Sequence, residues 1–476
     1  MFTRRFLEFL AAFALMGLLA AACGSGDDTD TAGDDAVDDQ TDDTDDTGDG
    51  GDDQTDDTGD DADDTDDAAD DPGADGVRQV PGEYATIQAA VDAAAEGDLV
   101  LIGEGVYNEA VIVQTDNLVI RGIDRNTVIL DGEASDTLEN GFLIVGNGVA
   151  VENLTVRNYV RNGIFFTGDY ANDFFVDGWR ASYVTVHNVG DYGVYAFNAV
   201  NGQIDNSFGA AAADSPFYVG QCKPCNALVY NVEGTTSQLG YSGTNSSGTT
   251  IAASWFHDNM IGIVNNSSDG EELAPHTGSL IVGNLVENNN NRMVPRKGDT
   301  YTIGVGSGIV MAGTDGNIVE RNTLVGNERA GVIVVDWIAE VLGGSTDFPA
   351  IGNVIRDNRI QGSLLDADLL LAKLDPAAGG QGNCYSGNTF GASIPADTQS
   401  VLPCDGADTA VLPPLTDLLV QFNIDDFEAA DFMALPAPAY DFDNMPGDPA
   451  TDPAEPAVGL PMEIDLDALV APEPSA

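Results

Sequence analysis

A short phrase that begins with Gly-Asn and ends with a second Asn recurs in the second half of the chain, and it constrains the fold more than any other feature. Its copies begin at Gly283, Gly316, Gly352 and Gly382, at intervals of 33, 36 and 30 residues. A second phrase, Gly followed by Ile or Val, recurs in the same cycle, at Gly163-Ile164, Gly193-Val194, Gly262-Ile263, Gly308-Ile309 and Gly331-Val332. Similarity at a period of about 20 to 50 residues is typical of solenoids, propellers and repeat arrays.

The residues within each repeat favour one of these architectures. The repeats are short β-branched runs of alternating polarity separated by Asn and Gly, a pattern that predicts strands. No helical periodicity interrupts them, which excludes helical solenoids, and two-residue hairpin turns are too scarce for a propeller. Asn tolerates the left-handed conformation of a sharp corner, and Asn side chains that recur at one corner stack through hydrogen bonds. We therefore expect an all-β solenoid, a parallel β-helix with three short strands per rung stacked about 4.8 Å apart.

The start of the repeat region indicates how the coil is closed. Residues 84–95 carry apolar side chains at helical spacing, and a strand signal follows at residues 99–102. A helix here would cap the open parallel edge of the first rung. This opening, through residues 103–110, is similar to that of the pectate-lyase-like superfamily. Together with the repeats, the resemblance covers residues 79–404 and implies a right-handed parallel β-helix with an N-terminal capping helix. That superfamily holds lyases, hydrolases, esterases, epimerases and adhesins, so the resemblance leaves the chemistry open.

The N-terminus carries an export signal. Arg4 and Arg5 precede an apolar run at residues 9–22 that is shorter than the roughly 20 residues of a membrane-spanning helix. The run ends in Leu-Ala-Ala-Ala-Cys23, which resembles the lipobox of bacterial lipoproteins. The resemblance implies a signal peptide at residues 1–22, lipidation of Cys23, and anchoring to the outer face of the bacterial cell membrane. The alternative is an ordinary cleavable signal followed by a chance cysteine.

Two acidic segments flank the repeats. Residues 27–75 contain 25 Asp and no Lys or Arg, and residues 405–476 contain 16 acidic residues and 11 Pro. Such compositions cannot bury enough apolar surface to fold, so we expect a disordered linker at 23–78 and an acidic, Pro-rich tail at 405–476. The formal net charge of −62 disfavours binding to nucleic acid, and we expect the membrane to be contacted through Cys23 alone. We expect a monomer. The acidity also fits solvation in a salty habitat.

Four cysteines remain after Cys23, and an even number in an exported chain predicts disulfides. Three pairings are possible, and proximity favours Cys222 with Cys225 and Cys384 with Cys404. The C-x-x-C spacing at Cys222 is also found in redox pairs and zinc sites. No second C-x-x-C accompanies it, and it does not open a helix after a strand, so a structural disulfide is the favoured interpretation.

Unequal repeats indicate the working face, because insertions in a β-helix emerge at its corners. The Gly-Ile/Val strand is flanked by the insertions at residues 169–180, 266–278 and 289–302. Alternation places Phe165, Tyr195, Tyr218 and Ser242 outward on four successive rungs, on the floor of the expected groove. Aromatic faces suit the C–H faces of sugar rings, so Tyr195 and Tyr218 are candidate polysaccharide-binding residues. The alternative is that these aromatics merely cover a sheet face.

Charged residues near this groove suggest chemistry. A lyase or epimerase acting on a uronic acid needs a base and a group that stabilises an enolate. In the lyases of the resembled superfamily, Lys, Arg, Tyr or His fill these roles, often with Ca²⁺. Lys223 and His276 are therefore candidate catalytic bases, Asn245 is a candidate substrate ligand at the same corner, and Asp269, Glu271 and Glu272 are candidate Ca²⁺ ligands. No cofactor is required for binding alone. The alternative is that the cluster is solvated surface.

A basic cluster lies in the third insertion, at Arg292, Arg296 and Lys297. Arg292 and Arg296 are candidate ligands for a carboxylate or sulfate on an anionic glycan, because guanidinium binds such groups bidentately. Pairing with neighbouring acids of the same chain is the alternative. Hydrolytic machinery is disfavoured, because we find no Asp pair on the groove strand: Asp315 and Asp336 are isolated.

The sequence therefore predicts a cell-surface lipoprotein whose β-helix groove binds polysaccharide, with a uronic-acid lyase or epimerase activity as the catalytic hypothesis. The alternatives are a non-catalytic adhesin that uses the same groove and a structural surface protein without a ligand. The scarcity of Lys and His disfavours catalysis, whereas the aromatic stripe and the unequal insertions disfavour a bare spacer.

Overall fold

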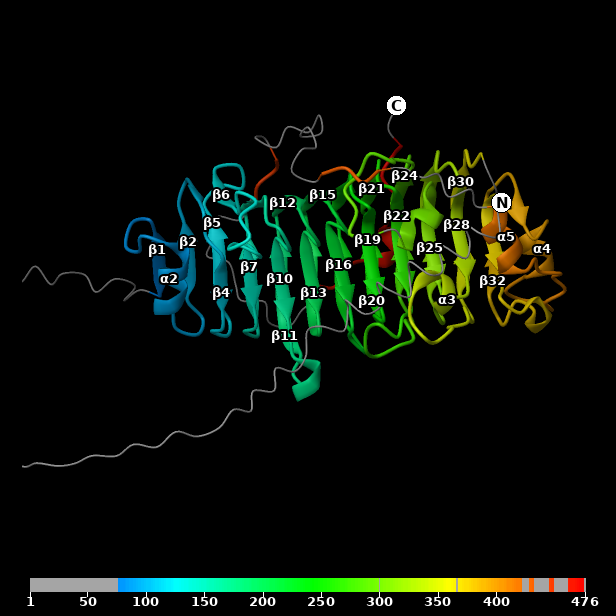
Figure 1. Cartoon of the computed structure of the whole chain (residues 1–476), viewed down its shortest axis with the longest axis horizontal. Helices are drawn as coiled ribbons and strands as arrows, with labels where there is room; N and C mark the ends of the chain where they lie inside the picture. Colours follow the sequence, from blue (N-terminus) through cyan, green and yellow to red (C-terminus); the bar gives the residue numbers. More distant parts are fainter. Residues whose placement is uncertain are drawn as a thin grey trace, which may run out of the picture.

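The computed structural model describes residues 76–298, 300–364, 367–421, 428–431, 445–448 and 461–474. Within them the chain winds into a right-handed parallel β-helix, the predicted fold (Figure 1). Three sheets run the length of the coil, and each interior strand pairs in parallel with its counterparts on the preceding and following rungs. We call them sheets A, B and C.

The strands of each sheet follow one another in chain order. Sheet A consists of β1 (Val77–Val80), β2 (Leu99–Ile102), β5 (Val119–Gly122), β8 (Val149–Glu152), β11 (Val176–Ser182), β14 (Ala199–Asp205), β17 (Ala227–Tyr230), β20 (Thr249–Ala252), β23 (Leu280–Val282), β26 (Ile318–Glu320), β29 (Val354–Arg356) and β32 (Cys384–Ser386). Sheet B consists of β3 (Gly105–Tyr107), β6 (Val128–Asp131), β9 (Thr155–Arg157), β12 (Thr185–Val189), β15 (Phe208–Ala212), β18 (Glu233–Thr235), β21 (Trp255–His257), β24 (Leu285–Glu287), β27 (Thr323–Val325) and β30 (Arg359–Gln361). Sheet C consists of β4 (Val111–Val113), β7 (Phe142–Ile144), β10 (Ile164–Thr167), β13 (Val194–Phe197), β16 (Phe217–Gly220), β19 (Leu239–Thr244), β22 (Ile261–Asn266), β25 (Ser307–Ala312), β28 (Ala330–Val335), β31 (Ala367–Ala372) and β33 (Ser393–Ile394).

Short helices lie at the ends and corners of the coil. The α-helices are α2 (Ile87–Ala93), α3 (Ala339–Leu342), α4 (Thr398–Val401) and α5 (Leu415–Gln421). The 3₁₀ turns are η1 (Tyr170–Asn172), η2 (Thr300–Gly304), η3 (Pro376–Ala378) and η5 (Leu466–Ala468). Across the described part of the chain, none of these helices is long and apolar enough to cross a membrane.

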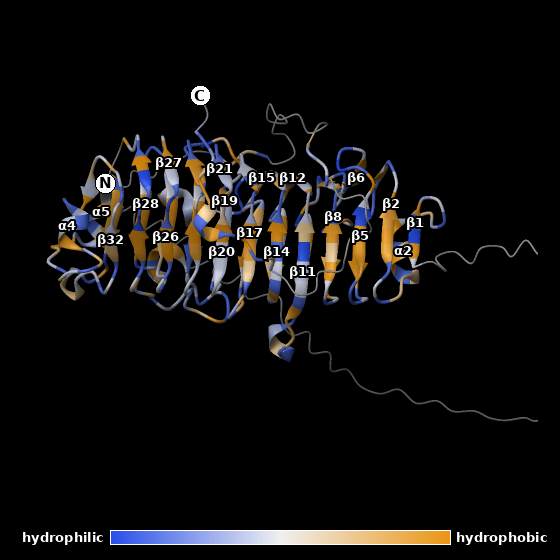
Figure 2. Ribbon diagram, turned by 180° about the vertical axis from the view of Figure 1, so that it is seen from behind, coloured by the Kyte–Doolittle hydropathy of each residue, from blue (hydrophilic) through white to orange (hydrophobic). Residues whose placement is uncertain are grey.

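The core lies inside the coil because alternate residues of every strand point inward. In β10, Ile164 and Phe166 are fully buried, and Val194 and Ala196 of β13 stack on them in register. Figure 2 shows apolar residues concentrated along the strands and hydrophilic residues at many corners and loops. The stack excludes water along the length of the coil, which is the main source of its stability.

Hydrogen-bonded Asn ladders line the corners. In one of them the Asn322 backbone N–H donates to Asn358 Oδ1 at 3.0 Å, and the Asn358 N–H donates to Asn388 Oδ1 at 3.0 Å. Gln399 of α4 ends this ladder by accepting from the Asn388 N–H at 2.6 Å. In this ladder the left-handed conformation belongs to the residue before the Asn, as at Arg321 with φ of 54°, whereas in the exposed Asn206–Asn231 ladder the Asn itself is left-handed, with φ of 48° and 52°.

The N-terminal end is capped as predicted. Helix α2 packs Ile87 and Val91 against the first rungs and is shorter at both ends than the expected 84–95. The Thr86 side chain accepts from the Ala89 N–H, and the Glu109 carboxylate accepts from the first N–H groups of the helix, which satisfies donors that a helix start leaves unpaired.

Disulfides and the C-terminal segment add long-range constraints. Cys222 is bonded to Cys225 and Cys384 to Cys404, the pairings that sequence proximity favours. Beyond residue 404, Leu412 joins the core and α5 packs beside sheet C.

The described parts of the acidic tail also contact the coil. The Asp448 carboxylate pairs with Arg121 at 2.7 Å, and the Leu466 carbonyl accepts from Arg321 at 2.7 Å. The predicted signal, Cys23 and most of the linker lie outside the described residues.

Candidate functional site

An aromatic stripe lies on the outer face of sheet C. Phe165, Tyr195 and Tyr218 occupy equivalent positions of β10, β13 and β16, as alternation predicts, and Tyr218 pairs with Ser242 of the next rung. The rings of Phe165 and Tyr195 are stacked with centroids 4.6 Å apart, and Tyr195 meets Tyr218 edge-on at 4.9 Å. Phe165 and Tyr195 are half-buried, so part of each ring is exposed to solvent, whereas Tyr218 is 1% exposed.

Tyr192 joins the stripe from the corner that precedes β13. Its ring stacks on Tyr195 at 4.3 Å and lies 4.8 Å from Tyr218. Lys297 Nζ lies 5.0 Å from the centre of the Tyr192 ring and 3.1 Å from Asp191. The insertion that contains Lys297 is fixed here because its backbone N–H donates to the Ala213 carbonyl at 2.7 Å.

Two of these tyrosines each hold a carboxyl group. The Tyr218 hydroxyl contacts both oxygens of Glu271, at 3.0 and 2.8 Å, and the Tyr192 hydroxyl bonds to Asp214. Asp214 Oδ1 is buried and has no hydrogen-bond partner among the described residues. Each carboxyl group is thus engaged by a tyrosine of the stripe, and the charge of Asp214 acts on Glu271.

Burial changes the protonation of both groups. It raises the pKa of Glu271 to about 8, an effect that the charge of Asp214 reinforces and that Tyr218 and Lys297 oppose. Burial also raises the pKa of Asp214 to about 6, against the opposing effects of Lys297 and Tyr192. Burial therefore favours the protonated form of both carboxyl groups.

Asn245 fixes the loop that carries Glu271. Its Nδ2 donates to the carbonyls of Ser268 at 2.6 Å, Glu271 at 2.8 Å and Glu272 at 3.0 Å. Its Oδ1 accepts from the Ser268 N–H at 3.0 Å. The sequence suggests Asn245 as a substrate ligand, but its amide is engaged by the protein, so it positions Glu271.

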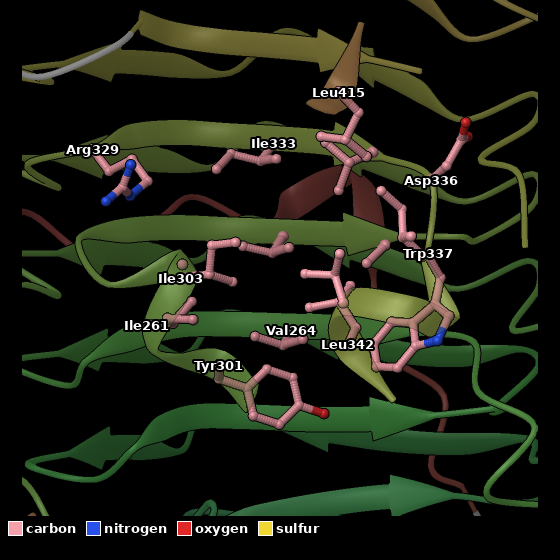
Figure 3. Close-up of a pocket in the computed structure, with 16 residues that line it drawn as sticks. Ile261, Val264, Tyr301, Ile303, Arg329, Ile333, Asp336, Trp337, Leu342 and Leu415 are labelled. Carbon is pink, nitrogen blue, oxygen red and sulfur yellow. The ribbon is translucent and has the colours of Figure 1, made fainter. Parts of the chain in front are cut away.

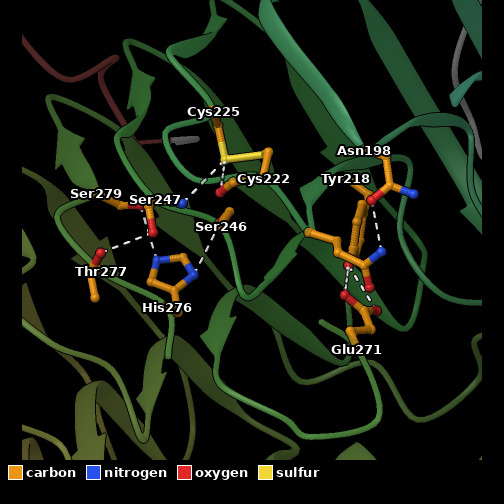
Figure 4. Close-up of a disulfide and its surroundings, with 11 residues drawn as sticks. Asn198, Tyr218, Cys222, Cys225, Ser246, Ser247, Glu271, His276, Thr277 and Ser279 are labelled. Atoms are coloured by element: carbon orange, nitrogen blue, oxygen red, sulfur yellow. Dashed lines mark hydrogen bonds between the residues drawn. A yellow bond between two sulfur atoms is a disulfide. The ribbon is translucent and has the colours of Figure 1, made fainter. Parts of the chain in front are cut away.

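His276 lies beside the Cys222–Cys225 disulfide and apart from Tyr218 of the aromatic stripe (Figure 4), and Lys223 lies within the loop that this disulfide closes. His276 is fully buried, and its ring nitrogens lie 3.0 Å from the hydroxyls of Ser246 and Ser279. Burial lowers its pKa to about 3. Lys223 is exposed and donates to the Pro275 carbonyl at 3.2 Å. The structure does not bring either residue to the aromatic stripe.

The three predicted Ca²⁺ ligands point to different surroundings. Asp269 accepts from the Ser345 N–H at 3.0 and 2.9 Å, Glu271 bonds to Tyr218, and Glu272 is exposed. Within the described ranges, no three His, Cys, Asp or Glu side chains are grouped so as to hold a metal ion. The predicted calcium site is therefore not assembled here.

The basic cluster is divided as well. Arg292 bonds to both oxygens of Glu328, each at 3.2 Å. It therefore pairs with an acid of the same chain, which is the alternative to binding an anionic glycan. Arg296 is half-buried in the same insertion, and Lys297 is the member that reaches the aromatic stripe.

An apolar pocket continues the outer face of sheet C beyond the carboxyl pair (Figure 3). Its volume is about 70 Å³, and it lies between η2 and α3, with Val264, Ile333 and Trp337 in its wall. Tyr301 of η2 also lines the pocket, and burial raises the pKa of Tyr301, with smaller contributions from the charges of Asp214 and Glu271. This tyrosine therefore links the pocket to the carboxyl pair.

Sequence reasoning did not select Tyr192, Asp214 or Tyr301. Tyr192 is three residues before Tyr195, and Asp214 directly follows the run of alanines that ends β15 and its corner. The signal available in the sequence was an acidic residue directly after an apolar run, since a carboxylate is rarely buried beside such a run unless it is paired.

Comparison with known proteins concerns the fold. Residues 162–342 match the family model described as "Right handed beta helix region". No curated protein sequence matches this chain. The A-module of the mannuronan C-5 epimerase AlgE6 of Azotobacter vinelandii is 15% identical, with 64% of this chain and 89% of that chain covered and a TM-score of 0.43. A DFA-IIIase from Arthrobacter chlorophenolicus A6, without its lid and in complex with GF2, is 13% identical, with 68% and 91% covered and a TM-score of 0.42. A mannuronic acid specific polysaccharide family 6 lyase from human gut microbiota is 12% identical, with 63% and 84% covered and a TM-score of 0.37.

Proposed function

We propose that this protein binds a polysaccharide strand along the aromatic stripe of sheet C, and that Cys23 anchors it to the outer face of the bacterial cell membrane. The observation that carries the binding proposal is the stack of half-buried rings at Phe165 and Tyr195, flanked by polar groups at Tyr192 and Lys297. Sugar rings offer apolar C–H faces to aromatic rings and hydroxyls to polar neighbours. A row of rings on successive rungs suits a ligand that is itself a repeating chain.

The geometry favours binding over the predicted lyase or epimerase machinery. That chemistry needs a base beside a bound uronate, and Lys223 and His276 lie elsewhere. A non-catalytic adhesin would bind polysaccharide at the same stripe without converting it. One binding test therefore applies to both the enzyme and the adhesin.

The test compares two tyrosines that face outward on different sheets. Tyr195→Ala removes the centre of the stripe, whereas Tyr230→Ala removes a half-buried tyrosine at the end of β17 in sheet A. We expect Tyr195→Ala to weaken binding by about 1–2 kcal/mol, a factor of about 5 to 30, through lost stacking. Tyr230→Ala should leave the affinity unchanged.

The measurement is isothermal titration of the purified protein with soluble xylan, dextran, inulin, alginate and polygalacturonate. Equal affinities of wild type and Tyr195→Ala for every bound glycan would contradict the stripe as the binding site. If wild type binds none of these polysaccharides, the structural role without a ligand is the surviving alternative.

A further inference from the structure

We infer that the Lys373 side chain condenses with the Asp336 carboxyl group to form an amide cross-link between two neighbouring rungs of the coil. The inference is independent of polysaccharide binding, because it concerns two buried side chains of this chain and involves no ligand. The sequence leaves Asp336 as an isolated acid and does not single out Lys373. The structure pairs them.

Strand register places the two side chains opposite each other. The last residues of β28 and β31, Val335 and Ala372, are paired. Asp336 and Lys373 follow them directly, so they stand opposite on neighbouring rungs. Lys373 Nζ lies 2.5 Å from Asp336 Oδ1, and the two side chains are only 1% and 6% exposed. The nitrogen is therefore held in contact with the carboxyl group and shielded from bulk water, as condensation requires.

Backbone groups hold both partners in this position. The Ala350 N–H donates to Asp336 Oδ1 at 2.8 Å, and the Leu374 N–H donates to Asp336 Oδ2 at 2.7 Å. The Ala350 carbonyl accepts from Lys373 Nζ at 2.7 Å. When the nitrogen bonds to Cγ, negative charge develops on the carboxyl oxygens. The two N–H groups point at those oxygens and stabilise this charge, as an oxyanion hole does.

Burial favours the amide over the ion pair. An ammonium and a carboxylate that are both enclosed lose their hydration, and their mutual attraction repays this loss only in part. The amide is neutral, and the water that it releases returns to the solvent. Condensation therefore removes a desolvation cost that a permanent ion pair would keep.

A second carboxyl group is near Lys373. Burial raises the pKa of Asp315, and the charge of Lys373 is among the effects that oppose this rise. The backbone of Asp315 pairs with Ile351, the neighbour of the Ala350 carbonyl to which Lys373 donates. Asp315 Oδ1 is buried and has no hydrogen-bond partner among the described residues. Asp315 is therefore the candidate proton relay for the reaction.

The reaction balances without a co-reactant. The Lys373 ammonium gives one proton to the Asp336 carboxylate, which yields a neutral amine and a carboxylic acid. The amine nitrogen then bonds to Cγ and loses a second proton. The bond between Cγ and the hydroxyl oxygen breaks as that proton joins the leaving hydroxyl. One amide and one water are formed, and no oxidant or reductant is consumed.

Tryptic mapping of the full-length protein tests the inference. Trypsin cleaves after Arg329, Arg356 and Arg359 but not after an acylated lysine. Residues 330–356 contain the aspartate, and residues 360–476 contain a single lysine and no arginine. After reduction of the disulfides, we expect these two peptides as one joined species. Its mass should lie about 18 Da, one water, below the sum of the separate peptides.

The same digest contains a matched control. Lys297 and Asp191 form an ion pair at 3.1 Å whose side chains are 46% and 14% exposed, so both ions keep part of their hydration. Their peptides should stay separate. Two variants test the assignment of residues. Lys373→Arg keeps the positive charge but replaces the amine by a poorly nucleophilic guanidinium, and it should release residues 330–356 as a free peptide. Asp315→Asn should slow the appearance of the joined species in freshly expressed protein by about 10²-fold.

The decisive measurement is made on the wild type and does not depend on whether a variant folds. Recovery of residues 330–356 and 360–373 as separate, unmodified peptides would overturn the cross-link and leave a buried ion pair. Joining of the Lys297 and Asp191 peptides as well would refute the argument from burial. An unchanged rate in Asp315→Asn would remove Asp315 from the reaction. None of these results bears on the binding test, so the two proposals fail separately.

Discussion

Replacing Asn322 by Leu tests whether the Asn ladder stabilises the coil. The Asn322 side chain is fully buried, and its Oδ1 accepts from the backbone N–H of Asn284 at 2.9 Å and from its Nδ2 at 3.0 Å. Its Nδ2 donates to the Ile281 carbonyl at 2.9 Å and to Asn358 Oδ1 at 3.0 Å. One side chain therefore joins three consecutive rungs.

The magnitude follows from the groups that lose a partner. Leu has a similar volume, so the loss of hydrogen bonds dominates over a cavity. The Asn284 N–H loses its acceptor inside the coil, and a buried unsatisfied group of this kind costs about 1–3 kcal/mol. The Ile281 carbonyl and Asn358 Oδ1 each lose one of their donors, which adds a smaller amount. We expect the free energy of unfolding to fall by about 3 kcal/mol.

Urea denaturation followed by far-UV circular dichroism measures this change. The control is Asn172→Leu in η1, which makes the same substitution at an exposed Asn whose Nδ2 bonds only within its own turn. We expect the control to shift stability by less than about 0.5 kcal/mol. If Asn322→Leu unfolds at the wild-type midpoint, the ladder does not stabilise the coil. If the free energy of unfolding falls equally in both variants, the effect is caused by the introduced Leu and not by loss of the ladder.

Two other predictions concern pH and the anchor. The folded pKa of Glu271 is raised to about 8, well above its unfolded value near about 4.3, so the folded state binds more protons than the unfolded state between these values. The contribution of Glu271 to the free energy of unfolding therefore falls as pH rises from about 4 to 8. The Glu271→Gln variant lacks this titrating group, so its free energy of unfolding should increase relative to that of the wild type over the same pH range. Parallel curves for the two proteins in urea titrations at several pH values would contradict the raised pKa. Cys23→Ser should release the protein from membranes while the β-helix stays folded. Retention of this variant in the membrane fraction after a carbonate wash would refute lipid anchoring.

The coil and its outward stripe were predictable because both follow from periodicity. A period of two residues decides which side chain of a strand faces outward, and the repeat decides which side chains stack. Phe165, Tyr195 and Tyr218 were therefore placed correctly from the sequence, before any contact was known. The same reasoning gave the capping helix, since apolar spacing changes from two to about 3.6 residues there.

Corner geometry was only partly predictable. The recurrence of Asn indicated a ladder, but it did not show that in the buried ladder the left-handed position and the ladder position are different residues. Arg321 and Asp357 take positive φ values of 54° and 56°, and the Asn that follows each one turns its side chain inward to the ladder. At another corner Asn231, with φ of 52°, is left-handed and also stacks, because its Nδ2 donates to Asn206 Oδ1 at 2.7 Å. One residue type thus serves two purposes, and composition alone cannot separate them.

The carboxyl pair could not be predicted because its partners meet through insertions, where periodicity ends. Glu271 reaches Tyr218 across 53 residues of sequence, and the four hydrogen bonds of the Asn245 side chain to the inserted loop fix its position. Asp214 is brought beside it from a corner that no repeat marks. Alternation along a strand predicts which side of the sheet each side chain faces. The position of an inserted loop depends instead on specific hydrogen bonds, which the sequence does not reveal. Its residues could therefore be identified as candidates, whereas their surroundings became apparent only in the structure: Glu271 is bonded to the Tyr218 hydroxyl and is not a calcium ligand beside Asp269.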